Sequence, residues 1–407
     1  MDSGPAAAPA AALSRRRLFR LSAGAGLALP VLATVPAGTA HAAGPIVKPL
    51  PPDLLTPRGT NAETRWDAMR GQGYFTPNDR FFVRNHTSTP RIDASTWRLR
   101  LWGTGLRGAP DEARAVEITY EQLRRLPAVT IAAAIECTGN GRSLYTTQQG
   151  QTVSGTAWGL GAIGVARWTG VRLSTLLERA GLTRDAVDVL PRGLDDPFTD
   201  GGADQGRVRR PLPVAKALSD VIVAYAMNGV PLPPDHGFPA RLVVPGWVGI
   251  ASIKWLGDIE VSRTPLSSPW DTRYYRLFGE GYPETGSAPL TRMNVKSAFE
   301  LAWNAELDAR TQVLHGRSWS GNGPVRRVSV STDGGRHWRP AAVRLDDAFH
   351  PRGWVRWTVP WRPPGPGRHE LLARATDLAG TTQPDVARHN TLGYLFGAVA
   401  RHPVTVK

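Results

Sequence analysis

A lone cysteine at the end of an apolar run is placed where it could ligate a metal or act as a reactive thiol. Cys137 is the only cysteine in 407 residues, and it follows the β-like residues 129–135. The glycine-rich residues 138–141 and then Arg142 come directly after it. A thiolate is a soft metal ligand, and side chains where a strand enters a loop commonly bind or react. A buried structural thiol is the alternative, because free cysteine is among the most buried residue types.

The cysteine count limits which metal sites are possible. One cysteine excludes an intramolecular disulfide, a four-cysteine zinc site, an iron–sulfur cluster and haem attached through Cys-x-x-Cys-His. A metal bound by Cys137 therefore takes its other ligands from a cofactor or from water.

Two further groups of side chains could bind an anion. They lie at predicted strand ends and turns and are Arg84, Asn85 and His86 in the first group, and His236, Arg241 and Lys254 in the second. Fixed positive charge together with several hydrogen-bond donors suits a phosphate-bearing group. Ordinary solvated loop residues are the alternative for each of them alone.

The overall charge restricts the class of partner. The chain carries a formal charge of +15, but its arginines are spread along it with no run of five or more. No nucleic-acid module is recognisable, so we expect a small-anion site and a basic surface, and no nucleic acid. No segment reaches the roughly 20 apolar residues of a membrane-spanning helix, so no membrane span is expected.

Residues 159–164 formally spell G-x-G-x-x-G, the fingerprint of dinucleotide-binding proteins. That fingerprint follows an apolar strand, and a helix starts at its third glycine. Here the preceding residues 151–157 are polar, and Gly170 interrupts the segment that follows. The sequence therefore argues against a nucleotide site.

Several predicted elements must position these residues. Residues 80–86 and 97–103 read as strands, and residues 173–180 read as a helix. A short helix is expected to begin after Thr119 as N-cap and to end before Pro127. The proline-rich residues 44–60 are expected to form an extended lead-in.

The composition changes near residues 262–290, where Ser, Pro, Tyr and Gly dominate. Short alternating strands follow, and residues 332–337 read as a hairpin turn, which together predict a β-sandwich. We therefore expect an α+β fold, in which a mixed α/β domain of residues 43–285 precedes an all-β domain of residues 286–407.

The first 42 residues read as an export signal. The arginines of residues 15–17 precede Leu18, Phe19 and a small, apolar stretch that ends in Ala-His-Ala at residues 40–42. This pattern resembles a twin-arginine signal peptide, with cleavage after Ala42 and export to the periplasm or the extracellular space. A basic amphipathic or ordinary secretory N-terminus is the alternative.

Together the motifs resemble the sulfite oxidase family of molybdopterin enzymes over nearly all of residues 50–407. The segments that carry the resemblance are residues 81–86, 136–140, 161–168, 224–229, 235–241, 254–256, 318–321 and 329–335. Bacterial, haem-free members, including the sulfane dehydrogenase-like branch, look most similar. The resemblance implies a sulfite-oxidase-type molybdopterin domain and then an immunoglobulin-like dimerisation domain, hence a homodimer.

The resemblance also implies roles for single residues. Cys137 would ligate the molybdenum of a molybdenum–molybdopterin cofactor. The matches to the family's pterin contacts are Phe82, Val83, Arg84, Asn85, His86, Asp195, His236, Arg241, Ser252, Ile253 and Lys254. The matches to its substrate pocket are Arg84, Arg142, Trp158 and Tyr275, with Tyr274 as a rival of Tyr275.

Two positions depart from the family's pattern. Gly141 stands where sulfite oxidases commonly carry a second arginine, and Pro324 stands where they often carry another. Arg326 or Arg327 could substitute, although their alternation with valines also fits ordinary strand positions. Each lost charge-assisted contact is worth roughly 1.5–3 kcal/mol, so a dianion would bind less tightly.

The activity implied by the resemblance is oxidation of sulfite to sulfate by oxygen-atom transfer. Because the chain has no haem motif, electrons would pass to an external acceptor such as a cytochrome. Two alternatives use the same cofactor, namely oxidation of another sulfur compound and reduction of an S-oxide. An exported anion-binding protein is the alternative that is not an enzyme.

Overall fold

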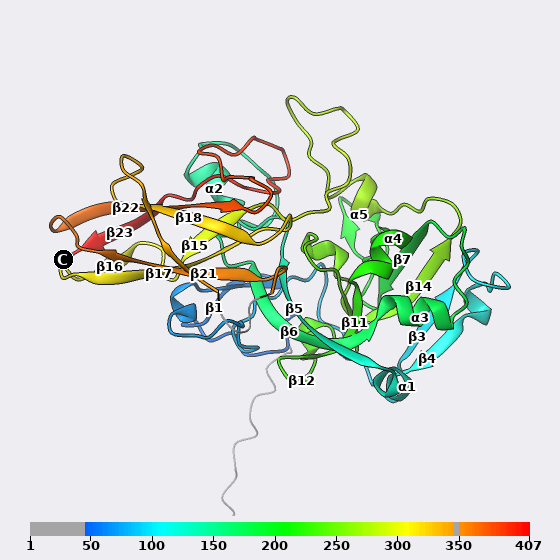
Figure 1. Cartoon of the computed structure of the whole chain (residues 1–407). Helices are drawn as coiled ribbons and strands as arrows, with labels where there is room; N and C mark the ends of the chain where they lie inside the picture. The colour runs from blue at the N-terminus through cyan, green and yellow to red at the C-terminus, as the bar shows by residue number, and fades with distance from the viewer. Residues whose placement is uncertain (1–44, 346–349) are drawn as a thin grey trace, which may run out of the picture. The chain divides into compact units, whose positions relative to one another are not determined.

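Sheets dominate the chain, and its helices are short (Figure 1). A computed structural model describes residues 45–345 and 350–407. The strands up to residue 262 are β1 (Leu55–Arg58), β2 (Asn61–Thr64), β3 (Arg98–Trp102), β4 (Val116–Thr119), β5 (Ala128–Glu136), β6 (Ile163–Arg172), β7 (Asp188–Gly193), β8 (Thr199–Asp200), β9 (Ala203–Asp204), β10 (Leu212–Pro213), β11 (Ile222–Met227), β12 (Val230–Pro231), β13 (Arg241–Val243) and β14 (Leu256–Ser262).

The helices all belong to this first part of the described chain. They are α1 (Tyr120–Arg125), α2 (Ser143–Thr147), α3 (Leu173–Arg179), α4 (Val214–Ser219) and α5 (Pro269–Thr272), with the 3-10 turns η1 (Asp67–Met69), η2 (Glu112–Arg114), η3 (Pro234–His236) and η4 (Gly249–Ala251). The predicted cap of α1 is confirmed, because the Thr119 hydroxyl accepts from the Gln122 amide and the Gln122 side chain accepts from the Thr119 amide. The helix predicted at residues 173–180 is α3.

Two five-stranded sheets form most of the first part of the described chain. One sheet runs β10-β7-β14-β3-β4, and the other runs β12-β11-β6-β5 with β13 paired to β11. A shared core joins the two sheets, because Leu101 and Ile259 from the first sheet cluster with Val171 and Val223 from the second. Strand β5 pairs antiparallel with β6 from Ala128 to Glu136, so it delivers Cys137 directly at its end.

For the N-terminal part, the structure agrees with the expected extended lead-in and corrects one expected strand. The lead-in of residues 44–60 contains β1, which pairs with β2 as a hairpin. Residues 80–86 do not form a strand, and only Val83 makes a bridge, to Ala62. The reason is that Phe81 and Phe82 are both buried and stack on each other at 5.3 Å, which the alternating faces of a strand would prevent.

The glycines of residues 159–164 allow close packing. The amides of Gly159 and Gly161 both donate to the Glu63 carboxylate, at 3.0 and 2.9 Å. A Cβ on Gly164 would lie 2.4 Å from the Phe81 ring. Gly164 lies within β6 and not at the start of a helix, so the requirement of the nucleotide fingerprint is not met.

The second part consists of two sheets over one core. Its strands are β15 (Lys296–Phe299), β16 (Ala305–Leu307), β17 (Gln312–Trp319), β18 (Val325–Ser331), β19 (Arg339–Pro340), β20 (Ala342–Arg344), β21 (Trp354–Trp361), β22 (Gly367–Asp377) and β23 (His402–Val406). They form the sheets β15-β17-β21-β20 and β16-β23-β22-β18-β19. Phe299 and Trp357 of one sheet cluster with Val330 and Leu371 of the other, so the two sheets share one core, as the predicted sandwich requires. Its immunoglobulin-like type stays a prediction.

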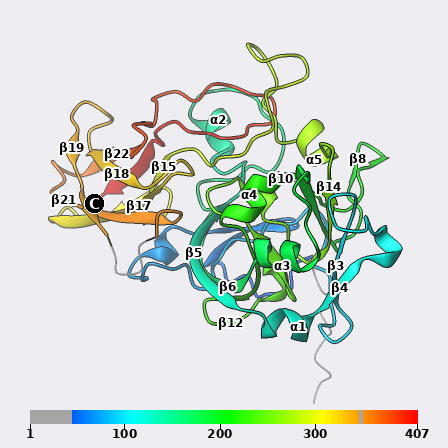
Figure 2. The same ribbon diagram turned by 45° about the vertical axis from the view of Figure 1, so that its right-hand side comes forward.

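The two parts share buried side chains. Trp319 and Trp354 of the sandwich cluster with Met69 and Tyr74. The segment that leads into β23 lies beside α2 in both views (Figure 1, Figure 2), where Gln148 donates to the Val399 carbonyl at 2.9 Å. The described residues from 45 onward form one compact unit, and the domain boundary after residue 285 stays a prediction. In the described residues, the helices are too short and polar to cross a membrane.

Candidate active site

The turn after β5 holds Cys137 in a defined position. The Cys137 amide donates to the Ala162 carbonyl at 2.9 Å, and the Cys137 carbonyl accepts from the Asn140 amide at 2.9 Å. The side chain is 9% exposed, so the thiol is nearly buried. Backbone hydrogen bonds on both sides therefore orient the one thiol of the chain.

A buried ion pair from the sandwich supports the same turn. The Lys296 ammonium donates to Glu136 Oε1 at 2.7 Å and to the Asn140 carbonyl at 2.9 Å. Asn140 in turn donates to Glu136 at 2.9 Å and accepts from the Ala162 amide at 3.0 Å. The residues on either side of Cys137 are thus bound to each other and to β15.

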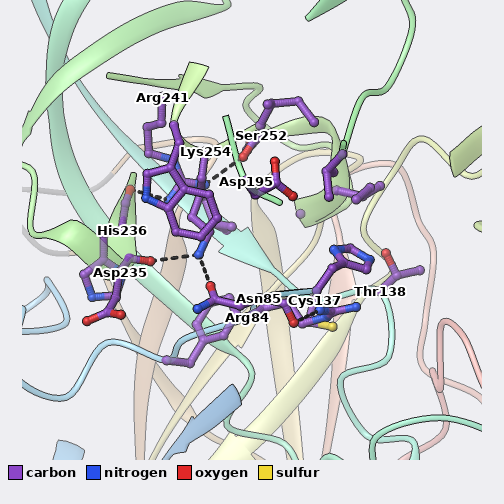
Figure 3. A pocket seen from close by; sticks show the side chains of 18 of the residues that line it. Arg84, Asn85, Cys137, Thr138, Asp195, Asp235, His236, Arg241, Ser252 and Lys254 are labelled. Atoms are coloured by element: carbon purple, nitrogen blue, oxygen red, sulfur yellow. Dashed lines mark hydrogen bonds between the residues drawn. The ribbon is translucent and has the colours of Figure 1, made fainter. Parts of the chain in front are cut away.

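Cys137 lies at the junction of two cavities. The first, which we call the basic cavity, is lined by Phe81, Phe82, Arg84, Asn85, His86, Ile135, Cys137, Thr138, Asp195, Val208, Asp235, His236, Arg241, Gly249, Ile250, Ser252, Ile253, Lys254, Trp255 and Tyr275 (Figure 3). Most of the predicted cofactor contacts, from four separate stretches of chain, therefore meet in one place.

Lys254 lies at the centre of the basic cavity. Its ammonium donates to the Asn85 side chain and, at 2.8 Å, to the Asp235 carbonyl (Figure 3). It also lies 4.0 Å from the Trp255 ring centroid. Desolvation, and then the neighbouring Arg241, lower the pKa of Lys254 well below its ordinary value. A negative group in the cavity would relieve that cost.

Arg241 and Ser252 form a second part of the wall. The Arg241 guanidinium donates to the carbonyls of His236 and Ser252, at 3.1 and 2.9 Å. Burial lowers the pKa of Arg241 to about 9. The Ser252 hydroxyl accepts from the Val244 amide at 3.1 Å. Backbone carbonyls orient the arginine here but do not neutralise its charge.

Three buried polar atoms of the basic cavity have no partner in the described residues. They are His236 Nε2, Asp195 Oδ1 and Thr138 Oγ1. Burial lowers the pKa of His236 well below its ordinary value and raises the pKa of Asp195 to about 6. Buried polar atoms are normally hydrogen-bonded, so these three indicate a polar ligand.

Asp235 is a residue of this site that sequence reasoning missed. It is fully buried and accepts from the Val47 and Lys48 amides at 2.9 and 2.7 Å. The Thr89 hydroxyl also donates to it, at 2.6 Å, and accepts from Asn85 at 2.9 Å. Asp235 thereby orders the chain around Asn85. In the sequence, its place beside His236 and within the family-like residues 235–241 pointed to it.

The second cavity, which we call the tyrosine cavity, has a volume of about 330 Å³. It is lined by Arg84, His86, Cys137, Arg142, Ser154, Gly155, Thr156, Phe198, Asp200, Tyr274, Tyr275, Leu392 and Tyr394. Arg142 is 7% exposed and donates to the carbonyls of Leu392 and Thr156, both at 2.9 Å. Arg84 and Arg142 thus bring two guanidinium groups to the cavity that contains the thiol.

The tyrosines of this cavity differ in their contacts. Tyr275 lines both cavities and is 5% exposed, and burial raises its pKa. The Tyr274 hydroxyl donates to Asp200, and burial with that contact raises its pKa to about 12. Because Tyr274 lines only the tyrosine cavity and its hydroxyl is already paired, Tyr275 is the better candidate beside Cys137.

Tyr394 and Leu392 were also missed. The Tyr394 ring stacks on Tyr275 at 5.2 Å and 9°, and the Arg142 guanidinium lies 5.3 Å from its centroid. The Leu395 amide donates to the Thr138 carbonyl at 2.9 Å. Residues 390–395 lack strand alternation and contain Gly393, which marks a loop but not where that loop lies.

Two predicted site residues line neither cavity. Val83 packs with Leu55 and Ala62, and its amide and carbonyl both pair with Ala62. Trp158 is fully buried behind Phe82, with ring centroids 6.4 Å apart. Neither the pterin contact at Val83 nor the pocket wall at Trp158 is supported by this geometry.

One of the two departures from the family pattern, Gly141, has a structural explanation. Gly141 has φ +90°, and a Cβ there would lie 3.2 Å from Phe396. An arginine at residue 141 would therefore need a strained backbone and a small shift of Phe396 in the C-terminal segment. Arg326 and Arg327 are exposed on β18 and line neither cavity, so neither replaces an arginine near Cys137.

The basic cavity fits a phosphate-bearing cofactor with a polar ring system. Lys254, Arg241 and Arg84 supply positive charge, while His236, Asp195 and Thr138 have polar atoms without partners. In the described residues, no group of three or more His, Cys, Asp and Glu could hold a metal. A metal at Cys137 would therefore need the cofactor to complete its ligands.

Comparisons with known proteins agree with this chemistry. Residues 86–270 match the model "Oxidoreductase molybdopterin binding domain", and residues 288–407 match "Mo-co oxidoreductase dimerisation domain". Sulfite oxidase of Gallus gallus is 36% identical over 344 residues, covering 80% of this chain and 71% of that protein. Mitochondrial sulfite oxidase of Homo sapiens is 34% identical over 352 residues, covering 82% of this chain but only 59% of that protein.

A solved structure extends the comparison to the fold. The sulfane dehydrogenase SoxCD from Paracoccus pantotrophus superposes with a TM-score of 0.70 at 27% identity and covers 84% of each chain. The fold and the cavities define a molybdopterin-dependent oxidoreductase. The chain belongs to the sulfite oxidase family, and its cofactor is molybdenum–molybdopterin.

Proposed function

We propose that the protein oxidises sulfite to sulfate and passes the electrons to an external acceptor. The observation that carries this proposal is the tyrosine cavity, which brings the guanidinium groups of Arg84 and Arg142 to the cavity wall that contains Cys137. Two guanidinium groups can bind the oxygen atoms of a sulfur oxyanion through charge-assisted hydrogen bonds. Such contacts would orient the sulfur atom toward the cofactor.

The residues have distinct roles in this proposal. Cys137 would ligate molybdenum as a thiolate, and Lys254, Arg241, His236 and Asp195 would bind the pterin and its phosphate. The cofactor supplies the oxygen atom and accepts two electrons. Tyr275 stays protonated, because burial raises its pKa, so its hydroxyl can donate a hydrogen bond beside Cys137. Arg84 and Arg142 would offset the negative charge of the substrate.

A second candidate uses the same cofactor on another sulfur compound. The structural likeness to a sulfane dehydrogenase favours it. Reduction of an S-oxide would require the same residues with the electron flow reversed. The sequence contains no haem motif. For each of these reactions we therefore propose a separate redox partner such as a cytochrome.

The test combines metal analysis with a steady-state assay. The purified mature protein should contain molybdenum and pterin, and sulfite should reduce a one-electron acceptor such as ferricyanide. Mutating a residue that supports a metal ligand typically lowers activity roughly 10- to 100-fold. Cys137→Ser removes the ligand itself, so it should reduce activity by more than that. A Cys137→Ser variant with full activity, or a protein without molybdenum, would contradict the proposal.

We also propose export through the twin-arginine route, as the first 42 residues indicate. These residues lie outside the part of the chain that the structure describes. N-terminal sequencing of the exported protein should find Ala43 first. An intact Met1 in the exported fraction would contradict this.

A further inference from the structure

The tyrosine cavity is larger than a bare oxyanion requires. Its volume is about 330 Å³, whereas one water in the liquid takes up about 30 Å³ and a cavity of about 150 Å³ can hold benzene. Sulfite, with four heavy atoms, would leave most of that space to water. Part of this volume, beside Cys137, would hold the metal centre, but the whole is about twice what a benzene ring needs.

One part of the wall of this space is aromatic and aliphatic, beside the charged and polar side chains that complete it. The rings of Phe198, Tyr274, Tyr275 and Tyr394 line it, and Leu392 adds an aliphatic side chain. Phe198 and Tyr274 meet edge to face at 6.5 Å, while Tyr275 and Tyr394 stack at 5.2 Å. Aromatic walls of this kind recognise apolar or aromatic groups, whereas a bare oxyanion gains from them only the hydrogen bonds that tyrosine hydroxyls donate.

The cavity is lined by charged side chains of both signs. Arg84 and Arg142 contribute two positive charges, and Asp200 lines the same cavity with one negative charge. Asp200 pairs with Arg273 at 3.1 Å, but that arginine does not line the cavity. Asp200 therefore offsets part of the positive charge that the two arginines bring to the cavity.

We propose that this site takes an organic sulfinate, in which a carbon substituent replaces one oxygen of sulfite. The SO₂⁻ group would bind between Arg84 and Arg142 beside Cys137, and the organic group would lie against the tyrosines and Leu392. A sulfinate keeps the lone pair on sulfur that sulfite offers. The inference rests on the proposed function, because it uses the same cofactor and the same reaction centre.

The reaction balances as R–SO₂⁻ + H₂O → R–SO₃⁻ + 2 H⁺ + 2 e⁻. One sulfur–oxygen bond forms with the sulfur lone pair, and sulfur is oxidised by two electrons. The oxygen derives from water, whose two protons go to solvent. The electrons pass singly to the external one-electron acceptor, for which ferricyanide serves in the assay. The carbon–sulfur bond stays intact.

The test compares sulfite, methanesulfinate and benzenesulfinate with the molybdenum-loaded enzyme and ferricyanide. The two sulfinates have the same charge, so their difference reports the organic group alone. We expect kcat/KM for benzenesulfinate to exceed that for methanesulfinate by roughly tenfold or more, because the ring is buried against apolar walls. Mass spectrometry should identify benzenesulfonate as the product, and kcat/KM for benzenesulfinate should equal or exceed that for sulfite.

Leu392→Arg tests the wall directly. A third guanidinium should raise kcat/KM for sulfite relative to benzenesulfinate by about tenfold, since it adds a charge-assisted contact and removes apolar surface. Leu392→Met alters the shape of the wall without adding charge, so it should keep the order of preference. An unchanged sulfite-to-benzenesulfinate ratio in Leu392→Arg would contradict the placement of the organic group.

The outcomes separate this inference from the proposed function. If sulfite is oxidised and benzenesulfinate is not, the inference is wrong and the proposed function stands. If benzenesulfinate only inhibits competitively, the inference is equally wrong. If the molybdenum-loaded enzyme oxidises neither compound, the proposed function fails, and the inference fails with it.

Discussion

At the scale of single residues, the basic cavity concentrates charges and polar atoms whose burial is costly. Lys254 and Arg241 are positively charged groups with strongly lowered pKa values, and His236 and Asp195 have unpaired buried atoms. Such groups lower the stability of a protein unless a ligand satisfies them. The cofactor is that ligand, so binding and stability should be linked at this site.

Asp195 should make the free energy of unfolding depend on pH. Its pKa of about 6 in the folded, cofactor-free protein lies above the ordinary 3.8, so the folded state binds the proton more tightly than the unfolded state. The free energy of unfolding should therefore fall as pH rises from about 4 to about 6, by up to about 3 kcal/mol, and stay lower above that range.

Urea unfolding of cofactor-free protein at several pH values measures this effect. Asp195→Asn should remove the decline and be the more stable form at pH 7. Asp196→Asn, at the exposed neighbouring position, controls for the loss of one negative charge. If Asp195→Asn retains the decline, burial of this carboxyl is not its cause.

Gly141 gives a second prediction at this scale. Its φ is +90°, and a Cβ would lie 3.2 Å from Phe396. Gly141→Ala should cost about 1–2 kcal/mol for the left-handed backbone and a further 1–3 kcal/mol for overpacking. Gly150→Ala is the matched control, because its φ is +67° and nothing lies within 4 Å. Equal urea midpoints for the two variants would contradict a steric role of Phe396.

At the scale of elements, the turn after β5 depends on strands from the far end of the chain. β15 supplies Lys296 to Glu136, and the segment before β23 bonds to Thr138 and Arg142. The sandwich thus forms one side of the active site and supplies Tyr394 to its wall. Changes in the sandwich should therefore alter chemistry at Cys137.

Lys296→Met tests this dependence. Both side chains of the Lys296–Glu136 pair are 2% exposed, so removing one charge leaves the other buried and unpaired. The expected loss of unfolding free energy is about 3–5 kcal/mol, with lower molybdenum content. Lys407→Met, which breaks an ion pair with side chains 66% and 64% exposed, should cost no more than about 1 kcal/mol.

Glu136→Gln in the Lys296→Met background should recover part of the loss, because it removes the unpaired charge. Calorimetry of the three variants provides the comparison. A Lys296→Met protein as stable as Lys407→Met would show that the pair does not support the turn.

At the scale of the whole molecule, the match of residues 288–407 to a dimerisation domain predicts a homodimer. The sandwich cannot simply be deleted to test this, because Trp319 and Trp354 share a core with Met69 and Tyr74. Light scattering of the full mature chain should give twice the mass of one chain. A single-chain mass at micromolar concentration would contradict the prediction.

The sequence by itself identified Cys137, the cations around it and the division into a mixed part and a sandwich. These features are local, since a strand end, a turn or an alternating run depends on neighbouring residues. It also predicted the N-cap of α1, and it argued against a nucleotide site at residues 159–164. It was wrong about a strand at residues 80–86, because burial of both Phe81 and Phe82 overrides local preference.

Only the tertiary structure decided which distant residues meet at the thiol. Lys296 is 160 residues from Glu136, and Arg142 donates to a carbonyl 250 residues away, at Leu392. Such contacts follow from the packing of all the sheets together, which no local pattern encodes. The same packing brought Tyr394 and Leu392 into the tyrosine cavity and placed Trp158 behind Phe82, in the wall of the basic cavity. The sequence thus determined the cofactor class, while the packing determined the shape and charge of the substrate cavity.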